Sequence, residues 1–315
     1  MSSAFGYALV AALGNVVGAL AVTRRAAGEL ALIEHFVAFG AGFMLAVALV
    51  EVLPEAFARS GPAAPALVLA GYLAVHFTQH TLTPHFHFGE ETHAVNRVAG
   101  TSAVVGLLLH TFFDGVAIAS AFLVRPALGL MVFIAIFLHK LPEGVTVSSL
   151  MMAGGRSGGQ AIGAAAMLGA ATLAGVALTD QISFLVHHGL ALSAGVTIYV
   201  AASNLVPEFQ GKRVHKLPEG VTVSSLMMAG GRSGGQAIGA AAMLGAATLA
   251  GVALTDQISF LVHHGLALSA GVTIYVAASN LVPEFQGKRG WKLPAAFFAG
   301  AATFYVTKAI LDSVS

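Results

Sequence analysis

Residues 128–153, LGLMVFIAIFLHKLPEGVTVSSLMMA, are apolar over more than the length of a bilayer crossing, yet His139, Lys140 and Glu143 lie near their centre. An apolar run of about 20 residues is what crosses the hydrocarbon core of a membrane as a helix. One isolated carboxylate there costs at least ~2.5–3.5 kcal/mol on insertion scales, so ionisable groups at this depth indicate function. The stretch therefore predicts a transmembrane helix that carries a functional polar site.

The rest of the chain has the same character. Of 315 residues, 57% are hydrophobic and 9% are charged, whereas soluble domains carry about 25% charged residues. The net charge of +1 provides no basic face, so we expect no nucleic-acid partner. Cysteine is absent, which excludes disulfides and thiolate ligands. We expect an all-α polytopic membrane protein that contacts lipid and needs no organic cofactor.

Apolar stretches separated by polar breaks predict spans at 5–23, 36–55, 63–83, 102–124, 128–153, 159–178, 182–206 and 293–311. All should be helices, because lipid offers backbone groups no other partner. The first stretch lacks a basic segment and a cleavage site, so we expect a retained span instead of a removed signal. With the N-terminus outside, most basic residues near span ends fall inside, which favours this orientation in the cell membrane.

A histidine-rich segment, 76–97, joins the third and fourth spans and should face the cytoplasm. The residues that we expect to bind metal loosely there are His80, His85, His87 and His93. A solvated spacer is the alternative interpretation.

An internal copy interrupts the second half. Residues 139–213 recur unchanged as 215–289, which indicates a very recent duplication or an artefact of sequence assembly. The copy lacks the apolar run that precedes His139, so we expect a half-helix or re-entrant piece at 215–230, followed by two full spans. Basic residues then stay inside. This arrangement predicts ten crossings with the C-terminus outside.

A weaker repeat relates spans two and seven. Ala41-Gly42 lies 13 positions before Pro54-Glu55, and Ala194-Gly195 lies 13 before Pro207-Glu208. The two spans run in opposite directions, as in the inverted repeats of secondary transporters; chance similarity of two Ala/Gly-rich helices is the alternative.

Further residues on these two spans are weaker candidates. Glu51 and Asn204 occupy equivalent places in the repeat and could line a path, although polarity at helix ends explains them as well. Met44 could offer a thioether, but a lone methionine in an apolar helix is usually packing.

Two adjacent spans each place an imidazole and a carboxylate one helical turn apart. The pairs are His110 with Asp114, and His139 with Glu143. Residues at i and i+4 share a helix face, so two packed helices would converge two nitrogen and two oxygen ligands. That set suits zinc and its first-row neighbours. The alternative is a pair of His–carboxylate contacts that only cross-link helices.

Small residues and a proline accompany these pairs. Pro142 frees the carbonyl of Leu138 and should kink the helix. Gly115 and Gly144 permit close helix approach.

With these motifs the sequence resembles the ZIP (zinc/iron-regulated-transporter-like) family. The matching elements are His110-x3-Asp114-Gly115, His139-x2-Pro142-Glu143-Gly144, Leu53-Pro54-Glu55-Ala56, Tyr199 with Val206-Pro207-Glu208, and the histidine-rich segment. The resemblance covers 1–206 and the final span, 292–312, and leaves out 215–289. It implies an eight-helix bundle with an inverted repeat, a metal path between spans two, four, five and seven, and import of zinc or a similar divalent ion towards the cytoplasm. Here the duplication would add about two spans and a half-helix.

One departure from the family concerns a second metal. Some relatives carry Asn after the span-four His and an acid after the span-five His, which help to hold a second ion; here these positions are Thr111 and Lys140. An ammonium can take the electrostatic place of that ion, so we predict one ion per site, with Lys140 paired to Glu143 when metal is absent.

The first copy should build the site, because it has a complete helix. We expect His215 and Glu219 to be non-functional.

Two rival functions remain open at this point. An intramembrane zinc-dependent hydrolase would use the same ligands to activate water, but His-Glu-x-x-His is absent and no separate general base is evident. We therefore expect no enzyme. A duplicated relic that no longer transports is the other alternative, and the sequence leaves a homodimer open.

Overall fold

The computed structural model describes residues 2–24, 39–82, 97–205, 231–255 and 269–274, together with 228, 258, 265 and 278. Within these residues every regular element is helical, as the all-α prediction requires. The chain divides into two compact units, which are described separately: Met1–Phe209 with Phe285–Ser315, and Gln210–Glu284.

The first unit contains all seven predicted spans up to residue 205. Its elements are α1 (Ser2–Thr23), a helix at 39–46, the π-helical η1 (Val47–Val52), α3 (Leu53–Ser60), the short η2 (Gly61–Ala63), α4 (Ala64–His76), the π-helical η3 (Phe77–Leu82), α5 (Arg97–Val124), α6 (Pro126–Ala153), α7 (Gly158–Thr179), α8 (Ser183–Ile198) and the π-helical η4 (Tyr199–Leu205). The predicted last span, 293–311, lies outside the described residues.

Six helical runs in the described residues are long and apolar enough to cross a membrane. One of them, Phe39–Gln79, has 41 residues, and at about 1.5 Å per residue it is roughly twice as long as a bilayer core is thick. Gly61 interrupts this run with a φ of 53°, a left-handed value that favours glycine. The run therefore holds the second and third predicted spans, joined at Gly61.

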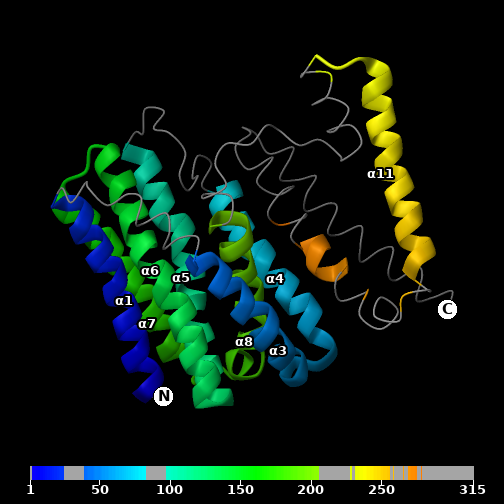
Figure 1. The fold of residues 1–315 in the computed structure, drawn as a ribbon. Helices are drawn as coiled ribbons and strands as arrows, with labels where there is room; N and C mark the ends of the chain where they lie inside the picture. The colour runs from blue at the N-terminus through cyan, green and yellow to red at the C-terminus, as the bar shows by residue number, and fades with distance from the viewer. Residues whose placement is uncertain are drawn as a thin grey trace. The chain divides into compact units, whose positions relative to one another are not determined.

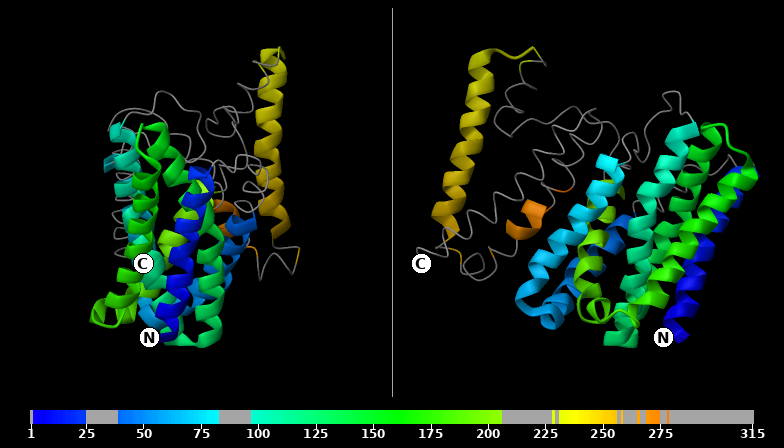
Figure 2. Two further views of the ribbon diagram at one scale, coloured as in Figure 1. Left: turned by 90° about the vertical axis from the view of Figure 1, so that its left-hand side faces the viewer. Right: turned by 180° about the vertical axis from the view of Figure 1, so that it is seen from behind.

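The helices of this unit form two groups (Figures 1 and 2). In the four-helix group, α1 packs against α6 and α7, and α5 packs against the same two helices. In the α8 group, which comprises η1–α3, α4–η3 and α8–η4, α3 and α4 pack against α8. The most extensive contact between the two groups is that of α5 with α8.

Glycines bring the helices of the four-helix group together, as the sequence predicts. A Cβ on Gly144 would overlap the backbone oxygen of Asn15 in α1. A Cβ on Gly115 would overlap the backbone oxygen of Thr172 in α7. The backbones of α5 and α6 thus lie against their neighbours with no room for a side chain at these two points.

Among the described residues of the first unit, the π-helical segments all belong to the α8 group, and none lies in α1, α5, α6 or α7. In η1 the widened turn ends as Leu53 donates to the carbonyl of Ala48, directly before Pro54, which has no N–H to give. When Pro54 is aligned with Pro207, η1 overlies η4 to within one residue. The weak repeat of spans two and seven is therefore accompanied by the same backbone irregularity, a kind that is frequent at functional sites.

In the second unit, α11 (Gly234–Thr255) has the same 22 residues as α7. Both helices begin with the same capping box. The Gln160 N–H donates to Ser157 Oγ at 3.3 Å, and the Gln236 N–H donates to Ser233 Oγ at the same distance. The same residues thus start this helix with the same hydrogen bonds in both copies. Of the predicted half-helix at 215–230, only Met228 is among the described residues. His215 and Glu219 lie outside them.

Candidate metal centre

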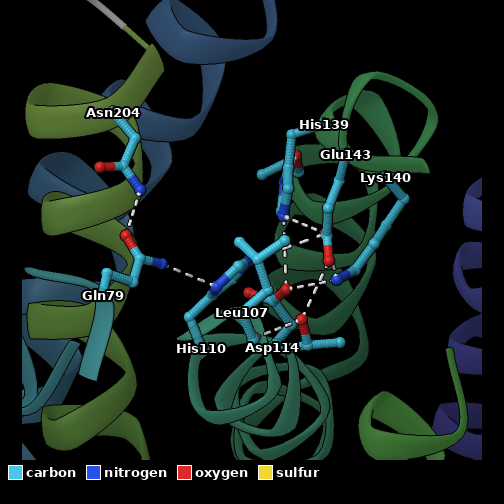
Figure 3. A network of polar contacts seen from close by, with 10 residues as sticks. Gln79, Leu107, His110, Asp114, His139, Lys140, Glu143 and Asn204 are labelled. Carbon is cyan, nitrogen blue, oxygen red and sulfur yellow. Dashed lines mark hydrogen bonds and ion pairs between the residues drawn. The ribbon is translucent and has the colours of Figure 1, made fainter. Parts of the chain in front are cut away.

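The four predicted ligands come together between α5 and α6 (Figure 3). Helix α5 supplies His110 and Asp114, and α6 supplies His139 and Glu143. All four are buried, with exposed fractions of 1% to 3%. One candidate ligand atom from each residue lies within 4.8 Å of the others. Helical periodicity aims each pair at the neighbouring helix, and the single residue between α5 and α6 sets the two helices side by side.

The closest contacts cross from one helix to the other. His139 Nε2 lies 3.3 Å from Asp114 Oδ2, and His110 Nε2 lies 3.7 Å from Glu143 Oε2. Zinc bonds of 2.0–2.2 Å in a tetrahedron place ligand atoms about 3.3–3.6 Å apart. These two distances are close to those that one zinc-sized ion requires, and the whole set of two nitrogen and two oxygen donors lies within 4.8 Å.

Lys140 holds the two carboxylates of the cluster. Its Nζ lies 2.7 Å from Asp114 Oδ2 and 2.7 Å from Glu143 Oε2, and the side chain is fully buried. The predicted contact of Lys140 with Glu143 is thus present, and Asp114 is a second partner. Thr111 Oγ1 lies 2.9 Å from Glu143 Oε1, where its hydroxyl can donate. With neutral imidazoles, the two carboxylates and one ammonium leave a net charge of −1, which favours a cation.

Asn204 reaches the cluster through a residue that the sequence analysis did not single out. Its Nδ2 donates to Gln79 Oε1 at 2.9 Å, and Gln79 Nε2 lies 3.2 Å from His110 Nδ1. Gln79 lies on η3 at the end of the third span and is fully buried. The sequence feature that could have identified Gln79 is an amide inside an apolar span. The histidines on either side of it were interpreted instead as the start of the histidine-rich segment.

Glu51 does not join the cluster. It forms an ion pair with Arg125, whose Nη2 lies 2.7 Å from Glu51 Oε2, and Arg125 Nη1 lies 3.6 Å from Glu55 Oε2. Since Arg125 separates α5 from α6 and Glu51 lies on η1, this pair links the two helix groups.

The remaining candidates are elsewhere or outside the described residues. Met44 is fully buried in the hydrophobic core of the first unit. His80 lies on η3, and its side chain is outside the part of the structure that is described. His85, His87 and His93, like His215 and Glu219 of the second copy, are outside the described residues.

Comparison with known proteins gives a consistent result. Residues 89–213 match the profile of the family described as ZIP Zinc transporter. The chain is 30% identical over 137 residues to "Zinc transporter ZIP6" of Homo sapiens and of Pongo abelii, covering 40% of this chain but 18% of each relative. It is also 30% identical over 218 residues to "Zinc transporter GufA" of Myxococcus xanthus, covering 64% of this chain and 85% of that protein. The profile match includes all four cluster residues.

Proposed function

The chain belongs to the ZIP zinc transporter family, and from that premise we propose that it carries divalent metal ions, zinc foremost, across the cell membrane towards the cytoplasm. The observation that supports this proposal best is the buried cluster of His110, Asp114, His139 and Glu143. Membership of this family points to a transporter and not to an enzyme, and the relatives are themselves named zinc transporters.

The donor set suits an ion that must leave again. Imidazole nitrogens give affinity for zinc, and carboxylate oxygens keep exchange possible. Lys140 contacts the two carboxylate oxygens that face the histidines, so an arriving ion has to displace an ammonium. We expect one ion per site, because this ammonium already supplies positive charge beside both carboxylates, in the electrostatic place of the second ion that the family resemblance implies. Binding also requires ligands without protons, which couples it to pH.

Transport then requires the site to open to each side in turn. We propose that the four-helix group, which carries the ligands, rocks against the α8 group, and this fits the inverted repeat better than an open pore. The pair of Arg125 with Glu51 joins the groups at the end that we assign to the outside. The ion would leave towards the histidine-rich segment on the cytoplasmic side.

The repeated segment supplies a matched control for the test. Purified protein in liposomes should take up zinc, and His139→Ala should abolish the uptake, whereas His215→Ala, in the same local sequence, should largely preserve it. Zinc uptake that survives His139→Ala would reject the assigned site. Zinc binding without any flux in the unmodified protein would support the non-transporting alternative.

A further inference from the structure

Three polar side chains from three spans form one hydrogen-bonded chain that ends at the metal cluster (Figure 3). Asn204 on η4 donates to Gln79 on η3, and Gln79 lies against His110 on α5. Their exposed fractions are 6%, 0% and 1%. Because Gln79 and Asn204 belong to the α8 group, this chain is a direct polar contact between that group and a ligand of the four-helix group.

The orientation of the two amides sets the direction of this chain. An amide nitrogen only donates and an amide oxygen only accepts. In this orientation Asn204 Nδ2 donates to Gln79 Oε1, and the amide nitrogen of Gln79 faces His110 Nδ1 at 3.2 Å. Nδ1 must therefore accept, and a neutral His110 ring carries its hydrogen on Nε2, the nitrogen that faces Glu143.

That tautomer is the wrong one for binding an ion. A neutral imidazole binds metal through its unprotonated nitrogen and donates its other N–H to a nearby acceptor. His139 has the acceptor that this requires, because its Nδ1 lies 3.2 Å from the carbonyl oxygen of Ala135, which can hold the ring hydrogen when an ion takes the place of the contact between Nε2 and Asp114 Oδ2. For an ion to bind His110 Nε2, the hydrogen must be on Nδ1, and Gln79 must present its oxygen.

We propose that Gln79 is a positioning residue and that an ion bound to His110 reverses the hydrogen-bond chain through Gln79 to Asn204. When the Gln79 amide turns over, its nitrogen faces Asn204, so the Asn204 amide must turn as well. Both amides lie on π-helical segments. The chain can make the same two hydrogen bonds in either direction, so it can reverse without losing one. The orientation of the amides on η3 and η4 therefore differs between the empty and the loaded cluster. This inference rests on the proposed function.

The tautomer of His110 can be read directly. In protein with 15N-labelled histidine in lipid nanodiscs, the His110 resonances are identified by their loss in His110→Asn. The metal-free protein should show hydrogen on Nε2 and none on Nδ1, and zinc should reverse this. A metal-free ring with its hydrogen on Nδ1, or a zinc-loaded ring that keeps it on Nε2, would overturn the inference.

Two substitutions of Gln79 separate this role from simple packing. Gln79→Glu only accepts, so it should place the hydrogen on Nδ1 before metal is added and lower the zinc dissociation constant about tenfold. Gln79→Met cannot accept from Nδ1–H, so it should raise that constant about three- to tenfold. A packing role would weaken binding in both variants.

A control and a comparison complete the test. Gln160→Glu adds the same charge at the exposed start of α7 and should change neither the affinity nor the tautomer. If zinc leaves the His110 resonances unchanged and His139→Ala does not affect binding, the proposed function itself fails. If zinc binds at this site and the ring hydrogen does not move, only the role of Gln79 fails.

Discussion

Replacing Lys140 by methionine should tighten zinc binding while it destabilises the empty protein. The Lys140 ammonium contacts Asp114 Oδ2 and Glu143 Oε2, each at 2.7 Å, and these are the oxygens nearest the two histidines. An ion therefore competes with the ammonium for the same atoms. A hydrogen bond to a charged group contributes ~1.5–3 kcal/mol. Displacing even one such contact corresponds to about a 10- to 100-fold change in the dissociation constant.

The metal-free variant should show the opposite effect. Lys140→Met leaves two buried carboxylates without a counter-charge, and breaking a buried pair typically costs about 3–5 kcal/mol of folding free energy. The melting temperature without zinc should fall, and zinc should restore it, because a ligand that binds only the folded state stabilises it. Transport should slow, since an ion held more tightly is released more slowly.

The assay is equilibrium competition with a chelating dye, in a background where His80, His85, His87 and His93 are alanine, so that loop sites do not contribute. Thermal unfolding is followed in the same preparations. Lys216→Met is the matched control, because it changes the same residue in the repeated segment. Unchanged or weaker zinc binding in Lys140→Met, with Lys216→Met equal to the parent protein, would refute the competition between ammonium and ion.

Two further predictions concern the same helix. In the background that lacks the four loop histidines, Lys140→Asp should raise the zinc content measured by elemental analysis from one ion per chain to two. A value that stays at one would contradict the idea that Lys140 takes the place of a second ion. Gly144→Ala should destabilise the folded protein by about 1–3 kcal/mol, because its Cβ would overlap the Asn15 backbone. Gly220→Ala, the same change in the repeated segment, should have a smaller effect. Equal melting temperatures for these two variants would show that α1 and α6 do not approach closely at Gly144.

The spans and the ligand pairs could be predicted from the sequence because both depend on local spacing. A bilayer sets the length of an apolar run, and the helical period places His110 with Asp114 on one face. The Lys140 contact with Glu143 follows from the same period, since the two residues are one turn apart on α6. These properties need no knowledge of which helices are neighbours.

The sequence could not show the contacts between distant spans. Gln79 meets His110 across 31 positions, and Arg125 meets Glu51 across 74. Such pairs depend on how the two helix groups pack. Glu51 and Asn204 are equivalent in the weak repeat, yet one pairs with an arginine and the other joins the chain to His110. The π-helical turns were also missed, because their residues are ordinary apolar ones apart from the nearby proline.

The identity of α7 and α11 makes the order of synthesis important. In the chain as it is written, two identical sequences 76 residues apart can compete for the position between α1 and α5 that α7 occupies. At about 5–20 residues per second, the first version has roughly 4–15 s to settle before its rival emerges. Both versions have the same residues with which to pack against α1 and α5. The order of synthesis and the length of the connecting chain therefore decide between the two. A chain that inserts slowly would be exposed to exchange of one version for the other.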